Sequence, residues 1–147
     1  MKIILLLTSF LLTSVFFNSC SSTDNKENTR IKSLEGTDWI LKSLNDKKVF
    51  TPEAGNDIYI RFNSKENRFG GFAGCNNISG NYTLIKDKIK FGPVAGTEMF
   101  CESRMEDERN FMKMFETVSK VEIKENDLLL YDGMGNIVAS FKAGKIK

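Results

Sequence analysis

Histidine is absent from this sequence of 147 residues. Imidazole is the base of Ser-His and Cys-His catalytic pairs and a frequent metal ligand, so its absence excludes these kinds of site. A catalytic site would have to depend on carboxylates, lysine or cysteine. We therefore expect a protein that is not an enzyme and that has no cofactor and no metal.

An excess of charge of either sign is also lacking. Lysine and arginine number 21 and aspartate and glutamate 19, which leaves a formal net charge of +2. This charge is too small to indicate binding to nucleic acid or steering towards an anionic partner. The hydrophobic fraction of 41% and the charged fraction of 27% are those of an ordinary globular protein. At this length we expect one domain, large enough to bury a core.

The long apolar run of the chain lies at its N-terminus, at residues 3–17, after the positive charge of Lys2. This run is shorter than the roughly 20 residues that span a bilayer, and it is typical of a signal peptide. Residues 17–20 resemble the bacterial lipobox, in which the cysteine is acylated and becomes the first residue of the mature chain. The sequence predicts a lipoprotein signal peptide at residues 1–19 and lipidation of Cys20. A plain secretory signal with an incidental cysteine is the alternative.

The segment after Cys20 is polar, and its residues 21–30 contain no hydrophobic side chain. Such a segment cannot bury enough surface to order itself, so we expect a lipidated flexible tether at residues 20–33. The folded domain is expected at residues 34–147. Several acyl chains on one cysteine, each CH₂ adding about 0.8 kcal/mol, hold a soluble domain at a membrane. We expect a monomer in the cell envelope, anchored by lipid to the periplasmic or surface face of the outer membrane.

The folded part is organised around residues 69–82, which contain four glycines, one cysteine and three aromatic residues. Glycine within strand-like sequence marks a bulge, a tight bend or the close approach of another backbone, so we expect a corner of a folded sheet here. No Gly-Lys-Ser/Thr follows, which excludes a phosphate-binding loop. Asn76 is expected to adopt a turn or left-handed conformation and to bind local backbone. A ligand-binding role for Asn76 is the alternative.

Short segments with alternating hydrophobicity predict about eight strands. The alternation is clearest at Ile58, Ile60 and Phe62. Gly92-Pro93 is expected to break the chain, with a further strand at residues 94–99. This pattern predicts a mainly β fold, either a small antiparallel barrel or a strongly coiled sheet.

One segment of the mature chain has a helical period, at residues 104–119. Ser103 and Glu106 have the spacing of a capping box. Four apolar residues lie on one face of the predicted helix: Phe111, Met112, Phe115 and Val118. Acidic residues gather at its start, where the macrodipole favours negative charge: Glu102, Glu106, Asp107 and Glu108. The dipole is a sufficient explanation for them without an acid–base pair.

Cys75 and Cys101 are the cysteines of the mature domain. An exported protein enters an oxidising compartment, in which two cysteines tend to form a disulfide. Closing a loop of about 26 residues would stabilise the fold by roughly 3–4 kcal/mol. Two separate buried thiols, or a redox or metal role, are the alternatives. Without histidine, two thiols lack the ligands of a closed zinc site.

Large aromatic residues are expected to fill the interior. We predict a core that contains Trp39, Phe62, Phe72, Tyr82 and Phe91. In the alternative, some of these side chains line an apolar cavity, because small barrels sometimes hold one ligand.

Four blocks of sequence follow one another along the domain. They are Gly36-Thr37-x-Trp39-x-Leu41-x-x-Leu44, Gly71-x-x-Gly74-Cys75-Asn76-x-x-x-Gly80-x-Tyr82, Thr97-x-Met99-x-Cys101 and Glu108-x-x-Phe111. Together they resemble the META (HslJ-like) domain family over nearly all of residues 34–142, with Phe100 and Phe115 as apolar departures from its usual residues. The resemblance implies a small, lipocalin-like antiparallel barrel closed on one side by a helix, in which these motif residues are structural.

The resemblance also bears on function. The family is linked to stress and antibiotic tolerance in bacteria and has no established catalytic activity. We expect a non-enzymatic envelope lipoprotein that binds or supports another envelope component under stress, with an envelope protein as partner. A carrier of a small apolar ligand in the barrel interior is the alternative, and an enzyme that uses carboxylates is a third hypothesis.

Overall fold

The structure is a computed structural model that describes residues 32–49 and 57–145. The predicted signal peptide, Cys20 and most of the predicted tether lie outside these residues. The part of the chain that is described contains no helix that is both long and apolar enough to cross a membrane.

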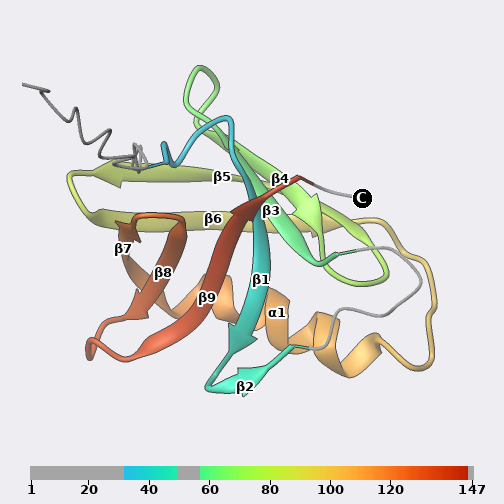
Figure 1. Ribbon diagram of the computed structural model, residues 1–147. Coiled ribbons are helices and arrows are strands. Elements are labelled where there is room, and N and C mark those ends of the chain that lie inside the picture. The colour runs from blue at the N-terminus through green and yellow to red at the C-terminus, as the bar shows by residue number, and fades with distance from the viewer. Residues whose placement is uncertain (1–31, 50–56, 146–147) are drawn as a thin grey trace, which may run out of the picture.

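The described residues form nine strands in one antiparallel sheet and one helix, α1 (Met105–Thr117), as Figure 1 shows. The strands are β1 (Asp38–Leu44), β2 (Lys47–Lys48), β3 (Tyr59–Asn63), β4 (Arg68–Phe72), β5 (Asn77–Ile85), β6 (Lys88–Gly96), β7 (Val118–Lys124), β8 (Asp127–Asp132) and β9 (Ile137–Gly144). From β3 to β9 each strand pairs with the next, and β1 pairs with both β3 and β9. The sheet therefore closes into a ring, which confirms the predicted mainly β fold with one helix.

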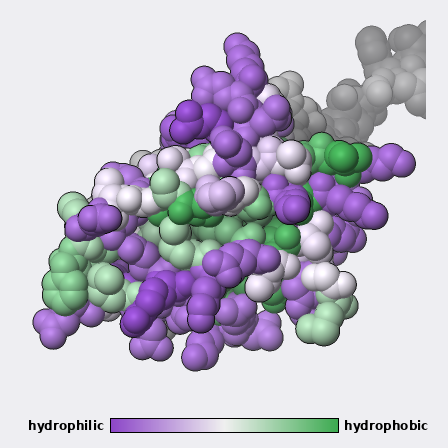
Figure 2. All heavy atoms as spheres, turned by 180° about the vertical axis from the view of Figure 1, so that it is seen from behind, coloured by the Kyte–Doolittle hydropathy of each residue, from purple (hydrophilic) through white to green (hydrophobic). Residues whose placement is uncertain are grey.

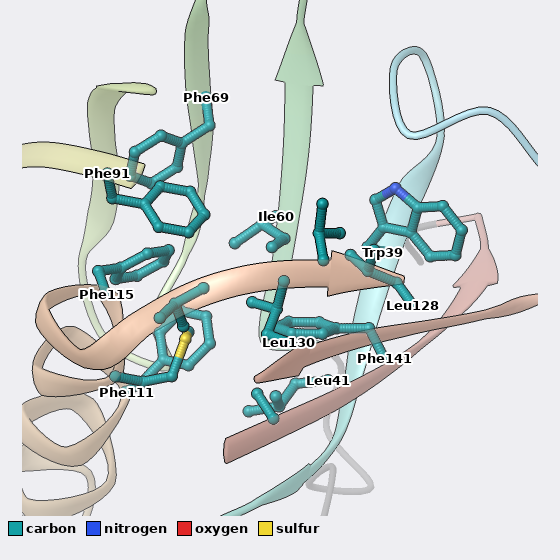
Figure 3. Close-up of a cluster of buried hydrophobic side chains, with 14 of the residues drawn as sticks. Trp39, Leu41, Ile60, Phe69, Phe91, Phe111, Phe115, Leu128, Leu130 and Phe141 are labelled. Atoms are coloured by element: carbon teal, nitrogen blue, oxygen red, sulfur yellow. The ribbon is translucent and has the colours of Figure 1, made fainter. Parts of the chain in front are cut away.

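The interior of the ring is filled by large side chains. Trp39, Phe62, Phe111 and Phe141 are each at most 2% exposed. Rings from different strands and from α1 pack together (Figure 3): Phe115 stacks on Phe69 with ring centroids 4.9 Å apart. Trp39 Nε1 donates to the carbonyl of Leu34 at 2.8 Å, so the largest core side chain has its polar atom satisfied. Such a core fits the predicted filled interior and leaves little basis for a carrier with a wide interior.

The prediction that Phe72 belongs to the core is wrong, because Phe72 is only half-buried. Side chains alternate between the two faces of β4, and Phe69 takes the inner face with 2% exposure. Phe72 stands three residues further along and therefore lies on the opposite face. Phe69 fills the predicted place and packs on Phe91, with ring centroids 5.0 Å apart.

The strand predicted to break at Gly92-Pro93 in fact continues as β6. Its register with β5 shifts there, because Tyr82 pairs with Phe91 whereas Gly80 pairs with Val94. One residue of β5 thus faces two residues of β6, which is the count of a β-bulge. A bulge accommodates proline, which has no N–H to donate to a neighbouring strand.

Helix α1 falls within the predicted residues 104–119, but the predicted capping box is absent. Arg104 is the N-cap, and no side chain hydrogen-bonds to the helix start. The buried face consists of Phe111, Met114 and Phe115, and Met112 is only partly buried. Val118, predicted on the helix, is the first residue of β7. The helix thus contributes two aromatic rings to the core and ends where the sheet resumes.

At two positions of the 69–82 segment, other groups approach the backbone so closely that only glycine fits, as the sequence predicted. A Cβ on Gly71 would overlap the carbonyl oxygen of Tyr59 in β3. A Cβ on Gly80 would lie 2.7 Å from the ring of Phe69. Both glycines therefore let neighbouring groups approach more closely than any side chain would allow.

We expect Gly71→Ala to lower the free energy of unfolding by about 2–3 kcal/mol, because the β3 backbone must move to admit the methyl group. Gly133→Ala is the matched control, since nothing lies within 4 Å of a Cβ built there. Its effect should stay within about 0.5 kcal/mol. Urea unfolding measures both variants, and equal midpoints would contradict the packing argument.

Candidate functional site

Asn76 is the one buried amide or charged side chain in the described residues, at 4% exposure. It lies between β4 and β5 and binds two other segments of the chain. Its side-chain oxygen accepts hydrogen bonds from Thr97 Oγ1 at 2.6 Å and from the backbone N–H of Met99 at 2.8 Å. Its side-chain nitrogen donates to the Met99 carbonyl at 3.1 Å and to Glu108 Oε1 at 2.8 Å. The amide thus makes the four hydrogen bonds of which it is capable.

The prediction that the Asn76 side chain binds local backbone is wrong, whereas the bend in which Asn76 lies fits the predicted turn conformation. Asn76 is not among the residues with positive φ, so its backbone is not left-handed. Its side-chain partners lie 21 to 32 residues away along the chain rather than in the local backbone. The side chain therefore joins distant segments instead of closing a local turn.

Glu108 of α1 binds the same corner. Its Oε2 accepts the backbone N–H groups of Asn76 at 2.8 Å and of Cys75 at 3.2 Å. Sequence reasoning grouped Glu108 with the other acidic residues of the helix start and missed this role. The Glu108-x-x-Phe111 block could have indicated it. Residues three apart lie on the same face of a helix, so Glu108 is on the side of α1 that carries the buried ring of Phe111.

Cys75 and Cys101 form the predicted disulfide, with their Cα atoms 5.9 Å apart. Cys101 ends a segment without regular structure at residues 97–101, which we call the 97–101 loop. It leads from β6 towards α1 at one end of the molecule (Figure 1). Asn76 holds the start and middle of this loop and the disulfide holds its end. The loop is therefore fixed against the sheet over its whole length.

Two apolar side chains nevertheless point out of this fixed loop. Met99 is 57% exposed and Phe100 is 80% exposed. Neither contributes much burial to the core in this position. A rigid backbone that presents an exposed aromatic ring and a thioether has the features of a binding site, because burying such side chains yields about 1.5–3 kcal/mol each.

The structure gathers seven motif residues at this corner and keeps the others apart. Those gathered are Gly74, Cys75, Asn76, Thr97, Met99, Cys101 and Glu108. Gly74 precedes the disulfide with a φ of +111°. Gly36 has a φ of +69°, and Thr37 Oγ1 donates to the Ser33 carbonyl at 2.8 Å. Trp39, Gly80 and Tyr82 belong to the core and its packing.

The carboxyl groups with shifted pKa lie elsewhere on the surface. A hydrogen bond from Tyr131 at 2.6 Å lowers the pKa of Glu122. Hydrogen bonds from Asn136 lower the pKa of Asp132 in the turn between β8 and β9. Each shift has a local cause in the strand or turn that contains it. Within residues 32–49 and 57–145, no three histidine, cysteine or acidic residues are grouped so that they could hold a metal ion.

We expect Glu108→Gln to lower the free energy of unfolding by about 1.5–3 kcal/mol, because glutamine has one acceptor oxygen. If that oxygen accepts the two backbone N–H groups, the new NH₂ group faces the side-chain NH₂ of Asn76, which then loses its acceptor. Glu106→Gln is the control, since Glu106 lies in the same first turn and meets the same helix dipole. Its effect should be within about 0.5 kcal/mol. Urea unfolding at neutral pH distinguishes hydrogen bonding to the corner from interaction with the helix dipole. Equal losses of stability in the two variants would mean that the dipole alone explains the effect of Glu108.

Comparison with known proteins gives a family and a fold. Residues 32–145 match the META domain. The chain is similar to "NMR structure of the protein from Burkholderia xenovorans", at 23% identity and a TM-score of 0.61, over 76% of this chain and 84% of that one. A second solved structure, "NMR structure of the protein", has 23% identity and a TM-score of 0.57, over 74% of this chain and 90% of that one.

These structural likenesses are too distant in sequence to show more than the fold. A search of curated proteins finds no significant match. The family match covers well over half of the chain and includes the corner and the 97–101 loop. The chain therefore belongs to the META domain family.

Proposed function

We propose that this protein is a non-enzymatic, lipid-anchored component of the cell envelope whose META domain binds an envelope protein under stress. The observation that carries the proposal is the exposure of Met99 and Phe100 on a loop that the Cys75–Cys101 disulfide and Asn76 hold in place. Methionine and phenylalanine are enriched at the centres of protein interfaces. A loop fixed before binding loses little conformational entropy on binding, so more of the burial energy appears as affinity.

The chemistry of the loop also specifies the partner. An aromatic ring that is 80% exposed requires a concave apolar surface for its burial. The partner we expect is therefore a protein with an apolar pocket that accepts Phe100, bordered by a smaller contact for Met99. The proposal involves no nucleic acid, cofactor or metal.

The predicted N-terminus determines where this contact takes place. Lipid on Cys20 would hold the domain at a membrane through the tether at residues 20–33. A flexible tether reaches about 5–6 Å times the square root of its length, which is on the order of 20 Å here. The monomeric domain would thus meet partners in or close to the outer membrane.

The loop is tested by recovery of a crosslinked partner from intact envelopes. The full chain is crosslinked in place and purified, and partner proteins are quantified by mass spectrometry. Phe100→Ser should reduce recovery of the partner about tenfold or more, which corresponds to the burial of one large apolar side chain. Met134→Ser is the control, because Met134 is 85% exposed in the turn between β8 and β9.

Equal recovery with Phe100→Ser and with the unchanged chain would contradict the proposed loop contact. Failure of the unchanged chain to recover any partner, in cells where a known lipoprotein pair is recovered, would contradict the interaction itself. Urea unfolding of both variants shows whether the fold is retained.

The anchor is tested separately with a palmitate analogue supplied to growing cells. The unchanged chain should carry the label and sediment with membranes, whereas Cys20→Ser should lose all label, because the other cysteines form a disulfide. Cys75→Ser is the control and should keep the label. Label that persists in Cys20→Ser, or an unlabelled mature chain that begins at another residue, would exclude lipidation of Cys20.

A further inference from the structure

The ring of strands has one incomplete seam, between β6 and β7. Lys88 pairs with Lys120, and the N–H of Val121 donates to the Asp87 carbonyl at 2.8 Å. The chain before Val118 is helical, so β7 cannot continue along β6. Within the described residues, positions 89–91 and 94–96 of β6 pair with β5 on one edge, and no residue of β6 beyond Lys88 pairs with a strand on the other.

Helix α1 packs at this opening and covers the core with side chains. The ring of Phe115 lies edge-on to that of Phe91 in β6, with centroids 4.9 Å apart. The backbone groups of a helix bind one another within the helix. Because most backbone groups of α1 are bound within the helix, α1 closes the opening with side chains and forms no ladder with the free edge of β6.

A groove of about 540 Å³ follows the first part of this edge. Its floor is apolar and comes from three elements: Ile89 and Phe91 of β6, Phe115 of α1 and Val118 of β7. Lys88 and Lys90 line it on the side of the sheet, and Glu116 of α1 lines it on the side of the helix. Figure 2 shows this side of the molecule, on which hydrophobic surface runs between hydrophilic margins.

We propose that this groove binds an extended peptide segment of a partner protein, which adds as a strand to the edge of β6 at residues 89–92. An extended segment is the ligand that offers backbone hydrogen bonds to a strand edge and side chains to an apolar floor at the same time. A ligand without a backbone would leave the edge unpaired, and a helix has no free backbone groups. This site is separate from the 97–101 loop and does not depend on the function proposed for it.

The surroundings of the groove specify the peptide further. Lys88 and Lys90 favour acidic side chains on the part of the peptide that lies towards the sheet, and Glu116 disfavours them towards the helix. The floor favours apolar side chains on alternate residues. The bulge at Pro93 ends the regular edge, which limits the contact to about four residues, or roughly 13 Å of extended chain. Lysine, proline and bulges also protect an edge against indiscriminate pairing, which suits a short and selective site.

The test uses hydrogen–deuterium exchange of the full chain in lipid nanodiscs. The probe is a six-residue peptide of alternating glutamate and valine with blocked ends. At ten times its dissociation constant, it should slow exchange in the segment 88–96 about tenfold. Lys90→Glu should weaken binding about fivefold. Lys65→Glu, an exposed residue of the turn between β3 and β4, is the matched control and should bind as the unchanged chain does.

Two methylated probes distinguish strand addition from mere apolar or charge contact. One is N-methylated at every valine and the other at every glutamate. Residues of one set direct their N–H groups towards β6 and those of the other set direct them away, so we expect one probe to lose protection and the other to retain it.

Three results would overturn the proposal. The first is equal binding of the two methylated probes, because it excludes backbone pairing. The second is the absence of protection in the segment 88–96 at about 1 mM of the unmethylated probe, which is the weak limit of specific binding. The third is protection that appears without peptide and grows with protein concentration, because it would assign the edge to pairing between two copies of this chain.

Discussion

A buried amide needs hydrogen-bond partners, and in this structure three separate segments come together to provide them at Asn76. Each buried polar group left unpaired would cost about 1–3 kcal/mol. The sheet corner supplies the amide, the 97–101 loop supplies three of its partners, and α1 supplies Glu108 as the fourth. Because all three segments must be in place at once, the amide couples the helix to the sheet. The disulfide from the adjacent Cys75 strengthens the same connection.

Closure of the ring is a second constraint, and hydrogen bonds satisfy it only in part. Eight of the nine strands form the ring. Neighbouring strands in it are joined by several residue pairs, except β6 and β7, which share a single pair. The Phe115 side chain stacks on Phe69 and meets Phe91, so packing replaces the missing ladder where α1 leaves the sheet. Stability at this seam therefore comes from apolar contact, and backbone groups remain on the edge of β6.

The sequence predicted the features that local pattern controls. Alternation identified Ile58, Ile60 and Phe62 as buried, and two cysteines in a chain with a predicted export signal indicated the disulfide. It failed where long-range register decides: Phe72 and Phe69 are both aromatic, and only the pairing of β4 shows which one faces inward. The partners of Asn76 lie 21 to 32 residues away, so local turn preferences could not reveal them.

The proposed binding role depends on which groups near the corner and β6 already have partners within the fold. At the corner, the amide of Asn76 and the carboxylate of Glu108 are occupied by each other and by backbone. What remains available around β6 and the loop that follows it is of another kind. It consists of the Phe100 ring and a strand edge beside an apolar groove, and the two proposed contacts with other proteins depend on these features.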